Sequence, residues 1–410
     1  MNALLNAMVV LLSGLAAQDF QVELKGPAKI PAGTPVQIAI PAGINVKSKT
    51  CLLSGAGTTN VLGQVVEKFS ADLTAKENQK YLVVVMPALS IPDNGATLAG
   101  TWLASDAKNS SFNFSFEDIN SELSQVTFEG KTVLQFVHPV LKDGKEREAS
   151  YKPFHHLFDN SGALVTKGAG GQFTHHRGIF LGFSKVTYGK NVKVDIWHCK
   201  DDTHQAFEKV LLRESGPVLA SEKDQIAWNG KNKETFAVEE RQLIVYKVPG
   251  GQLVEFQSVV RTTGGPVLLD GDPQHAGFHF RASNEVSEKT SKETIYLRPD
   301  GEDKPGASRN WPDLKTHINL PWNAMSFVLN DKRYTALYLD NAANPKEARF
   351  SERPYGRFGS YFVTEITKEN PLKLKYQIWL QDGKIDIESA KLKSQSFNNP
   401  VQAIMVAKKQ

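Results

Sequence analysis

Histidine is unevenly distributed along this chain of 410 residues. Nine of its ten histidines lie between His138 and His279, and they include two adjacent His-His pairs. Histidine exchanges a proton near neutral pH, because its ordinary pKa is about 6.5, and it is therefore a frequent general acid or base. A single histidine is more often a hydrogen-bonded core residue, but this clustering favours a catalytic or ligand-binding cavity.

The two pairs are His155-His156 and His175-His176, and Arg177 directly follows the second pair. If each pair lies on a β-strand, neighbouring side chains point to opposite faces, so only one member of a pair can enter a given pocket. His175 and Arg177 would then share one face. We predict that these segments contribute to a polar cavity, in which histidine transfers protons and arginine stabilises negative charge.

A second cluster lies between Gly271 and Arg281. On a regular strand, the period of two puts His275, Gly277, His279 and Arg281 on one face. The glycine leaves room for a ligand beside the charged and titratable groups. We therefore predict that His279 and Arg281 belong to the same cavity.

Two other segments supply carboxylate, aromatic and guanidinium groups. Asp195 and Trp197 offer a carboxylate and an indole ring that can stack against a sugar. The region from 309 to 359 is rich in aromatic, Asn and Arg residues within turn-forming sequences, and such loops often rim a ligand cleft on a β scaffold. Within this region we predict Arg353 and Tyr355 as substrate-binding residues.

The sequence assigns no cofactor. A metal site needs three or four converging ligands, and neither a His-x-His nor a His-Glu-x-x-His spacing is present. No Gly-x-Gly-x-x-Gly element occurs, and Gly168-Ala169-Gly170-Gly171 lacks the Lys-Ser/Thr of a phosphate-binding loop. We therefore predict no nucleotide cofactor and no metal, with a metal held by His and carboxylate ligands as the less favoured alternative.

The elements that must position these residues are predicted to be β-strands. Short runs such as Phe20 to Leu24 and Tyr81 to Met86 alternate with Gly, Pro and Asn turns, and long amphipathic helices are nearly absent. A large antiparallel system must close its edges, and no repeat of about 40–50 residues indicates a propeller. We predict an all-β chain whose larger domain is an antiparallel sandwich.

Four segments are predicted. Residues 1–17 form an apolar run that ends in small residues, which is typical of a signal peptide, so we expect an exported protein, periplasmic or extracellular. Residues 18–105 suit an immunoglobulin-like accessory domain. Residues 106–125 are predicted as a linker and first strand, and residues 126–405 as the large β-sandwich domain.

Composition limits the partners. The net charge is +4, from 48 basic and 44 acidic residues that are interspersed, so no nucleic-acid partner is expected. After Ala17 no apolar stretch reaches membrane-spanning length. The two cysteines, Cys51 and Cys199, are expected to be buried free thiols, with a disulfide between domains as the alternative. Nothing in the sequence indicates the oligomeric state.

The order of several motifs resembles the DUF6807 family, whose members are often labelled PmoA or methane oxygenase. The resemblance covers roughly residues 128–384. It is carried by Lys152-Pro153-Phe154-His155, Thr174-His175-His176-Arg177-Gly178, Asp195-Ile196-Trp197, the segment from Gly271-Asp272-Pro273 to Arg281, and Arg353-Pro354-Tyr355-Gly356. It implies an uncharacterised exported β protein of bacteria that degrade polysaccharides, including planctomycete-like lineages. Because this region has no spanning segment, we do not expect a methane monooxygenase subunit.

This context implies a carbohydrate ligand, and the mutarotase-like supersandwich is the nearest analogy for fold and mechanism. By that analogy His176 or His279 acts as general base or acid. His175, Arg177 and Arg281 then bind substrate and stabilise negative charge, with His175 also counted among the catalytic candidates. The substrate-binding candidates are completed by Trp197, Asp195, His155, Arg353 and Tyr355.

Three functions remain open from the sequence. The first is a carbohydrate-active hydrolase, lyase or epimerase that uses histidine acid/base groups. The second is a noncatalytic glycan- or surface-binding protein, in which the same groups only stack and hydrogen-bond. The third is a metal-dependent oxygenase or hydrolase.

Overall fold

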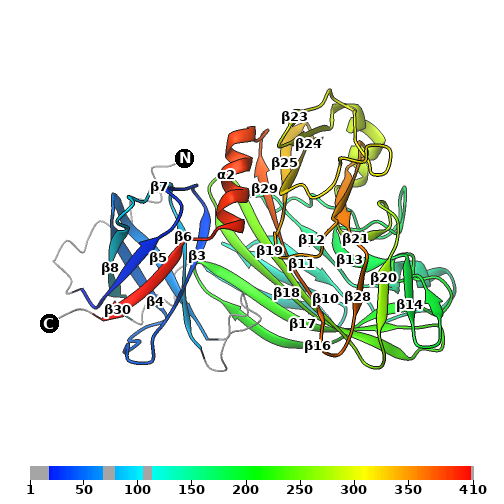
Figure 1. Cartoon of the computed structure of the whole chain (residues 1–410), viewed down its shortest axis with the longest axis horizontal. Helices are drawn as coiled ribbons and strands as arrows, with labels where there is room; N and C mark the ends of the chain where they lie inside the picture. Colours follow the sequence, from blue (N-terminus) through cyan, green and yellow to red (C-terminus); the bar gives the residue numbers. More distant parts are fainter. Residues whose placement is uncertain (1–17, 68–78, 105–112, 408–410) are drawn as a thin grey trace. The chain divides into compact units, whose positions relative to one another are not determined.

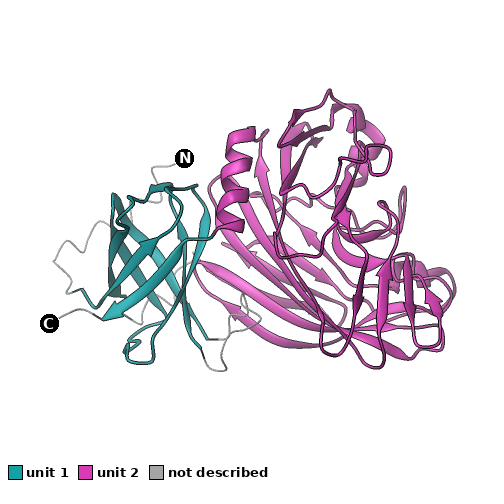
Figure 2. Ribbon diagram, in the orientation of Figure 1, with its two compact units in different colours: residues 1–110, 400–410 teal, residues 111–399 magenta. Residues whose placement is uncertain are grey.

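The structure is a computed structural model that describes residues 18–67, 79–104 and 113–407. The chain divides into two compact units, which Figure 2 colours separately. Unit 1 comprises residues 1–110 and 400–410, and unit 2 comprises residues 111–399. The predicted signal peptide, residues 1–17, and residues 106–112 of the predicted linker lie outside the described residues.

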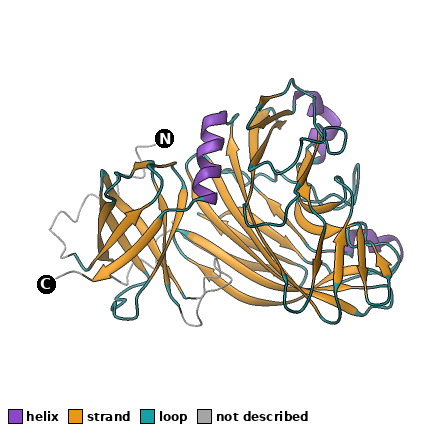
Figure 3. Ribbon diagram, in the orientation of Figure 1, coloured by secondary structure: helices purple, strands orange, loops and turns teal. Residues whose placement is uncertain are grey.

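Strands dominate both units, so the all-β prediction is confirmed (Figure 3). In unit 1, strand pairing runs without a break in the order β1 (Phe20–Lys25), β30 (Gln402–Ala407), β3 (Thr34–Ala39), β6 (Tyr81–Met86), β5 (Thr58–Val66), β4 (Thr50–Gly55) and β8 (Ala96–Trp102). Pairing of β8 with β1 closes this ring into a barrel. A two-stranded sheet adds β2 (Lys29–Ile30) and β7 (Leu89–Ser90). An immunoglobulin-like sandwich keeps two separate sheets, so the predicted architecture of this unit is corrected to a closed barrel.

The barrel follows from simple alternation. In β1 the side chains of Phe20, Val22 and Leu24 are buried, whereas Glu23 and Lys25 are exposed. The same period of two recurs in β3. The inward side chains of all strands therefore form one apolar core inside the ring.

The last strand of the barrel comes from the far end of the sequence. Strand β30 pairs antiparallel with β1 along its whole length, from Phe20 with Ala407 to Lys25 with Gln402. We predicted that residues up to 405 belong to the second domain, but this pairing places β30 in unit 1. Unit 2 is thus inserted between β8 and β30 of the barrel.

Unit 2 contains two large antiparallel sheets and a small one (Figure 1). The eight-stranded sheet has the order β26 (Arg349–Arg353), β27 (Arg357–Tyr361), β21 (Ala276–Arg281), β13 (Ile179–Phe183), β12 (Phe154–Leu157), β11 (Lys131–Val137), β10 (Leu123–Phe128) and β9 (Phe114–Asn120). The nine-stranded sheet has the order β16 (His204–Ser215), β17 (Leu219–Asn229), β18 (Thr235–Val248), β19 (Gly251–Thr262), β29 (Leu372–Asp382), β25 (Lys332–Asp340), β24 (Trp322–Leu329), β22 (Ile295–Arg298) and β23 (Gly301–Glu302). The four-stranded sheet has the order β15 (Val192–Val194), β14 (Lys185–Tyr188), β20 (Val267–Asp270) and β28 (Thr364–Ile366).

The two large sheets pack face to face through aromatic side chains. Phe278 of β21 lies 4.3 Å from Phe256 of β19 and 4.7 Å from Tyr376 of β29, measured between ring centroids. Such aromatic contacts combine large apolar burial with favourable ring geometry. The predicted large sandwich is therefore present, and its eight-stranded sheet contains β12, β13 and β21, next to which the predicted site residues lie.

Helices are short and few in the described part of unit 2. They are η2 (Gly144–Glu146), α1 (Arg147–Ser150), η3 (Val286–Thr290), η4 (Ser291–Glu293) and α2 (Ile387–Asn398). The longest, α2, begins where the Asp386 side chain accepts a hydrogen bond from the Ser389 backbone N–H, a normal N-cap. None of the helices in the described ranges is long and apolar enough to cross a bilayer.

The two cysteines belong to different units, Cys51 to unit 1 and Cys199 to unit 2. Both are buried free thiols, as predicted. Burial raises the pKa of Cys51 to about 12 and that of Cys199 to about 11, so both stay protonated at neutral pH.

Candidate functional site

Four histidines from three separate loops meet in unit 2, and we call His175, His176, His198 and His275 the histidine cluster. The ring centroid of His175 lies 4.3 Å from that of His176, 4.6 Å from that of His198 and 5.2 Å from that of His275. His275 also lies 4.7 Å from His198 and 5.5 Å from His176. The cluster is therefore one contiguous group of imidazoles.

His175 and His176 do not lie on a strand. They occupy a turn that ends just before β13, and both rings enter the cluster. The predicted placement of the two side chains on opposite faces of a strand is therefore wrong, since strand alternation does not apply to a turn. Of the two rings, His175 but not His176 lines the pocket described below. Two buried ammonium groups hold this turn: Lys152 Nζ donates to the His175 carbonyl at 2.8 Å, and Lys167 Nζ donates to the His176 carbonyl at 3.2 Å.

His198 and His275 are each oriented by an aspartate three residues earlier. Nδ1 of His198 lies 2.8 Å from Oδ2 of Asp195, and Nδ1 of His275 lies 3.0 Å from Oδ1 of Asp272. An ionised carboxylate can only accept, so in both pairs Nδ1 donates and Nε2 is left as the free nitrogen. This is the arrangement by which proteins set the tautomer of catalytic or metal-binding histidines.

Hydrogen bonds keep both aspartates ionised although burial alone would raise their pKa values. For Asp195 burial is opposed by hydrogen bonds from the side chain and backbone N–H of His198, and its pKa is lowered overall. For Asp272 burial is opposed by the hydrogen bond and charge of His275, and the pKa falls to about 2. The cluster therefore has two negative charges at its edge at neutral pH.

The other two histidines of the cluster are neutral at physiological pH. Burial is the main cause that lowers the pKa of His175 to about 2, and the neighbouring His198 and Lys152 act in the same direction. Burial, followed by the charge of Arg357, also lowers the pKa of His176 well below its ordinary value. Within the described part of the chain, Nε2 of His175 and Nδ1 of His176 have no hydrogen-bond partner. These nitrogens are therefore lone-pair donors or N–H groups available to a ligand.

A pocket of about 350 Å³ reaches the cluster from the surface. His175 and His198 form part of its wall, together with Arg147, Glu148 and Tyr151 of the α1 region. Gly144, Cys199 and Lys200 complete the lining. The cluster is thus accessible to a small polar molecule on the side of His175 and His198.

The predicted arginines are placed next to the cluster but are buried. Arg177 donates to the backbone carbonyls of Thr174 and Ala149 at 3.3 Å each and packs on the Tyr151 ring, so it ties the histidine turn to helix α1. Arg281 donates to the Tyr355 carbonyl and lies 4.8 Å from the centroid of the Tyr355 ring. Both guanidinium groups thus hold the backbone around the site.

His279 and Trp197 lie behind the cluster. Trp197 is 0 % exposed, and its ring lies 4.7 Å from His279 and 5.6 Å from His176. An enclosed indole cannot stack against a substrate, so the predicted stacking role is not compatible with its position. His279 is also buried, and its Nδ1 accepts from Arg357 at 3.1 Å.

His155 is separated from the cluster. On β12 it stacks on Phe136 at 4.4 Å, and its neighbour His156 points to the other face, where Nδ1 lies 3.0 Å from the Thr166 hydroxyl. Here the predicted strand alternation holds. No ring contact in the described ranges connects His155 to the cluster, so it takes a core position in the sandwich.

Tyr355 lies on the turn between β26 and β27, and Arg353 is the last residue of β26. The Tyr355 ring lies 4.7 Å from Phe173, which is 41 % exposed and borders His175 and His176 at 6.4 and 6.2 Å. Arg353 donates to the Glu352 carbonyl at 2.8 Å. The structure thus brings Tyr355 close to the cluster through Phe173 and gives Arg353 a local backbone contact.

Sequence reasoning assigned no role to His198, Asp272 and Phe173, and it placed His275 on the ligand-facing side of the second cluster without naming it as a site residue. A signal for three of them was present, because Asp195-Ile196-Trp197-His198 and Asp272-Pro273-Gln274-His275 share the spacing Asp-x-x-His. In both segments the aspartate caps a turn that returns the histidine ring to the carboxylate. For Phe173 no sequence signal was available.

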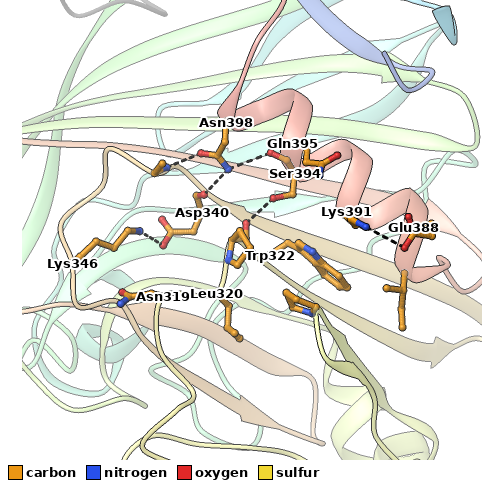
Figure 4. Close-up of a pocket in the computed structure, with 14 residues that line it drawn as sticks. Asn319, Leu320, Trp322, Asp340, Lys346, Glu388, Lys391, Ser394, Gln395 and Asn398 are labelled. Carbon is orange, nitrogen blue, oxygen red and sulfur yellow. Dashed lines mark hydrogen bonds and ion pairs between the residues drawn. The ribbon is translucent and has the colours of Figure 1, made fainter. Parts of the chain in front are cut away.

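A second, larger pocket of about 540 Å³ lies beside α2 and is bounded by residues of the loop-rich region (Figure 4). Its buried carboxylate, Asp340, is already paired with Lys346 at 2.6 Å and with the Asn344 amide at 2.6 Å. Asn398 of α2 donates to the Asp340 carbonyl at 3.2 Å. Because these polar groups satisfy one another, the histidine cluster is the stronger candidate for chemistry.

The comparison with known proteins identifies the family of the chain. No curated protein is detectably similar to this chain. The model of the DUF6807 family matches residues 124–394, which is more than half of the chain and includes every residue of the histidine cluster. The chain therefore belongs to DUF6807, a family of unknown function.

Proposed function

We propose that the protein is an enzyme that acts on a carbohydrate, by hydrolysis, elimination or epimerisation, in the pocket above the histidine cluster. The observation that carries this proposal is the convergence of four histidines, two of them oriented by aspartates, on a pocket of about 350 Å³. A structural histidine, such as His155 on β12, packs in the core away from such a cluster. A convergent set with unpaired nitrogens is typical of a catalytic centre.

His198 is the best candidate for general base. It lies in the pocket wall, and its hydrogen bond to Asp195 leaves Nε2 as the proton acceptor. Asp195 also stabilises the imidazolium that forms once the proton has been taken, as the aspartate of a catalytic triad does. This pair supplies proton transfer at a place that a substrate can reach.

The carbohydrate assignment rests on the surroundings of the cluster. The exposed ring of Phe173 and the ring of Tyr355 offer apolar faces beside the histidines. Arg147, Glu148 and Lys200 add charged groups to the pocket that can hydrogen-bond to sugar hydroxyls. Aromatic faces combined with a few polar groups are usual for small-molecule sites.

The apolar run of residues 1–17 supports a further part of the proposal, namely that the protein is exported. Mass determination of the protein secreted by its host should then give a chain that begins at Gln18. Recovery of the full-length chain from the cytoplasm would contradict export.

The decisive experiment is incubation of the purified protein with a panel of oligosaccharides, followed by mass spectrometry of the products. The His198→Ala variant should lose turnover by about 10²–10⁴-fold, which is the usual contribution of a general base. His204→Gln is the matched control, because both ring nitrogens of His204 already have partners, the Asp202 carbonyl and the Asn229 amide.

A noncatalytic glycan-binding protein is the alternative that the same experiment identifies. It predicts thermal stabilisation by one glycan without any product, and a larger effect of Phe173→Ala than of His198→Ala. Equal turnover by the His198→Ala variant and the wild-type protein would contradict the proposed catalytic role.

A further inference from the structure

We propose that His175, His176 and His275 form a binding site for one divalent first-row transition-metal ion, such as Zn²⁺. The inference deepens the proposed function, on which it rests for its chemical purpose, because it concerns the same cluster. The site itself is argued from nitrogen positions, unpaired polar atoms and supporting carboxylates.

The three imidazoles converge on one point. Each offers one ring nitrogen, and these three nitrogens lie within 4.8 Å of one another. Ligands at about 2.0–2.1 Å from a tetrahedral Zn²⁺ lie about 3.4 Å apart, so a small rotation of the rings, closing the nitrogens by about an ångström, completes the geometry. The side chains come from two loops, which brings the ligands together only in the folded protein.

The second observation is that buried nitrogens of the cluster lack partners. His176 is 1 % exposed, and among the described residues neither its Nδ1 nor Nε2 of His175 has a hydrogen-bond partner. Leaving a buried polar atom unpaired costs about 1–3 kcal/mol, so natural proteins rarely retain two at one point without a purpose. A metal ion between them accounts for both.

The third observation is the carboxylate behind His275. Asp272 holds Nδ1 of this ring at 3.0 Å, which fixes the tautomer in which Nε2 carries the lone pair. Histidines that bind metals nearly always donate their other N–H to such a partner. Together with Asp195, this aspartate also supplies the negative charge that offsets an incoming cation.

The nature of the ligands selects the ion. Imidazole suits zinc, copper, nickel and iron, whereas magnesium and calcium require oxygen ligands. Three protein ligands leave a position open for water, and the neighbouring His198 lies in the pocket wall with its own aspartate. A bound Zn²⁺ would lower the pKa of that water to about 7, which supplies a nucleophile or base at neutral pH.

Isothermal titration calorimetry of the chelator-treated protein with Zn²⁺ tests the site directly. We expect one Zn²⁺ per chain and no comparable binding of Mg²⁺. Co²⁺ should give the visible absorption of a nitrogen-ligated four- or five-coordinate ion. A chelator-treated chain that binds neither Zn²⁺ nor Co²⁺ would overturn the proposal.

Variants assign the binding to the cluster. His176→Ala should abolish Zn²⁺ binding, and Asp272→Asn should weaken it by about 10–100-fold, the effect expected of an outer partner of a ligand. Because Asp272 is partly exposed, this second variant should fold even if His176→Ala does not. His204→Gln should bind like the wild type. Unchanged affinity in Asp272→Asn and in His275→Gln would place the metal elsewhere and refute the site.

The proposed function and the proposed metal site can be contradicted independently of each other. If Zn²⁺ binds as expected but no oligosaccharide is converted, the metal site stands and the carbohydrate-active function is wrong. If neither Zn²⁺ nor Co²⁺ binds but products still form, the enzyme stands and the metal site is wrong.

Discussion

His156 should make the protein sensitive to mild acid. On β12 the Thr166 hydroxyl oxygen accepts the Leu157 backbone N–H at 2.9 Å, so the Thr166 hydroxyl proton is free to bond Nδ1 of His156 at 3.0 Å. In this arrangement Nδ1 accepts and the ring is neutral, which the burial of the side chain favours. Burial lowers the pKa of His156 from 6.5 to about 4.

The sign and size of the effect follow from this shift. Between pH 6.5 and pH 4 the unfolded chain binds a proton on His156 that the folded chain does not, so stability falls as the pH falls through this range. A fall of the pKa from 6.5 to about 4 corresponds to about 3 kcal/mol once the pH is well below 4, and to about 2 kcal/mol at pH 5. The His156→Gln variant should not lose this amount.

The assay is urea unfolding of the wild type and of His156→Gln at pH 7.5 and pH 5, followed by tryptophan fluorescence. Five of the six tryptophans lie in unit 2, so the signal reports mainly the unit that contains His156. The wild type should lose about 2 kcal/mol more than the variant between the two pH values. Parallel losses in both proteins would refute the argument that His156 is buried and neutral.

Two further substitutions test contacts that support the site and the sandwich. Gly178 has a φ of +25°, and a Cβ there would collide with the His155 carbonyl oxygen. Gly178→Ala should therefore lower the free energy of unfolding by about 2–4 kcal/mol and lower the thermal midpoint. An unchanged midpoint would contradict this interpretation. Arg298 Nε donates to Glu352 at 2.7 Å, and both side chains are buried. Arg298→Met should therefore cost about 3–5 kcal/mol in urea unfolding at pH 7, because it leaves a buried carboxylate without its main partner. A loss below 1 kcal/mol would show that Asn323 and His317 suffice.

The strand content of this fold was predictable because burial alternates along the chain. In β1, alternate apolar residues from Phe20 to Leu24 indicated a half-buried strand, and the structure has that pattern. The closing strand β30 was not assigned to unit 1, since local periodicity carries no information about which distant strand is the partner. The barrel and the insertion of unit 2 depend on that partner choice.

The candidate site was only partly predictable for a related reason. Composition located His175 and His176, but their joint approach depends on a turn in which Phe173 has a φ of +55°, and strand rules fail there. His198 and His275 come from loops about 20 and 100 residues further along the chain. Their meeting is a property of the sheet order, in which β13 lies directly beside β21.

The insertion of unit 2 between β8 and β30 makes the chain between these strands a loop of the barrel. When unit 2 is folded, the two ends of this loop are held at a defined distance. When unit 2 is unfolded, the barrel must close a disordered loop of about 290 residues, whereas an ordinary connection between strands has about 10 residues. That is about five doublings of loop length, at about 0.6 kcal/mol each, or about 3 kcal/mol of closure entropy. The integrity of unit 2 thus contributes to the stability of the barrel in unit 1, and a destabilised unit 2 should lower the unfolding midpoint of both.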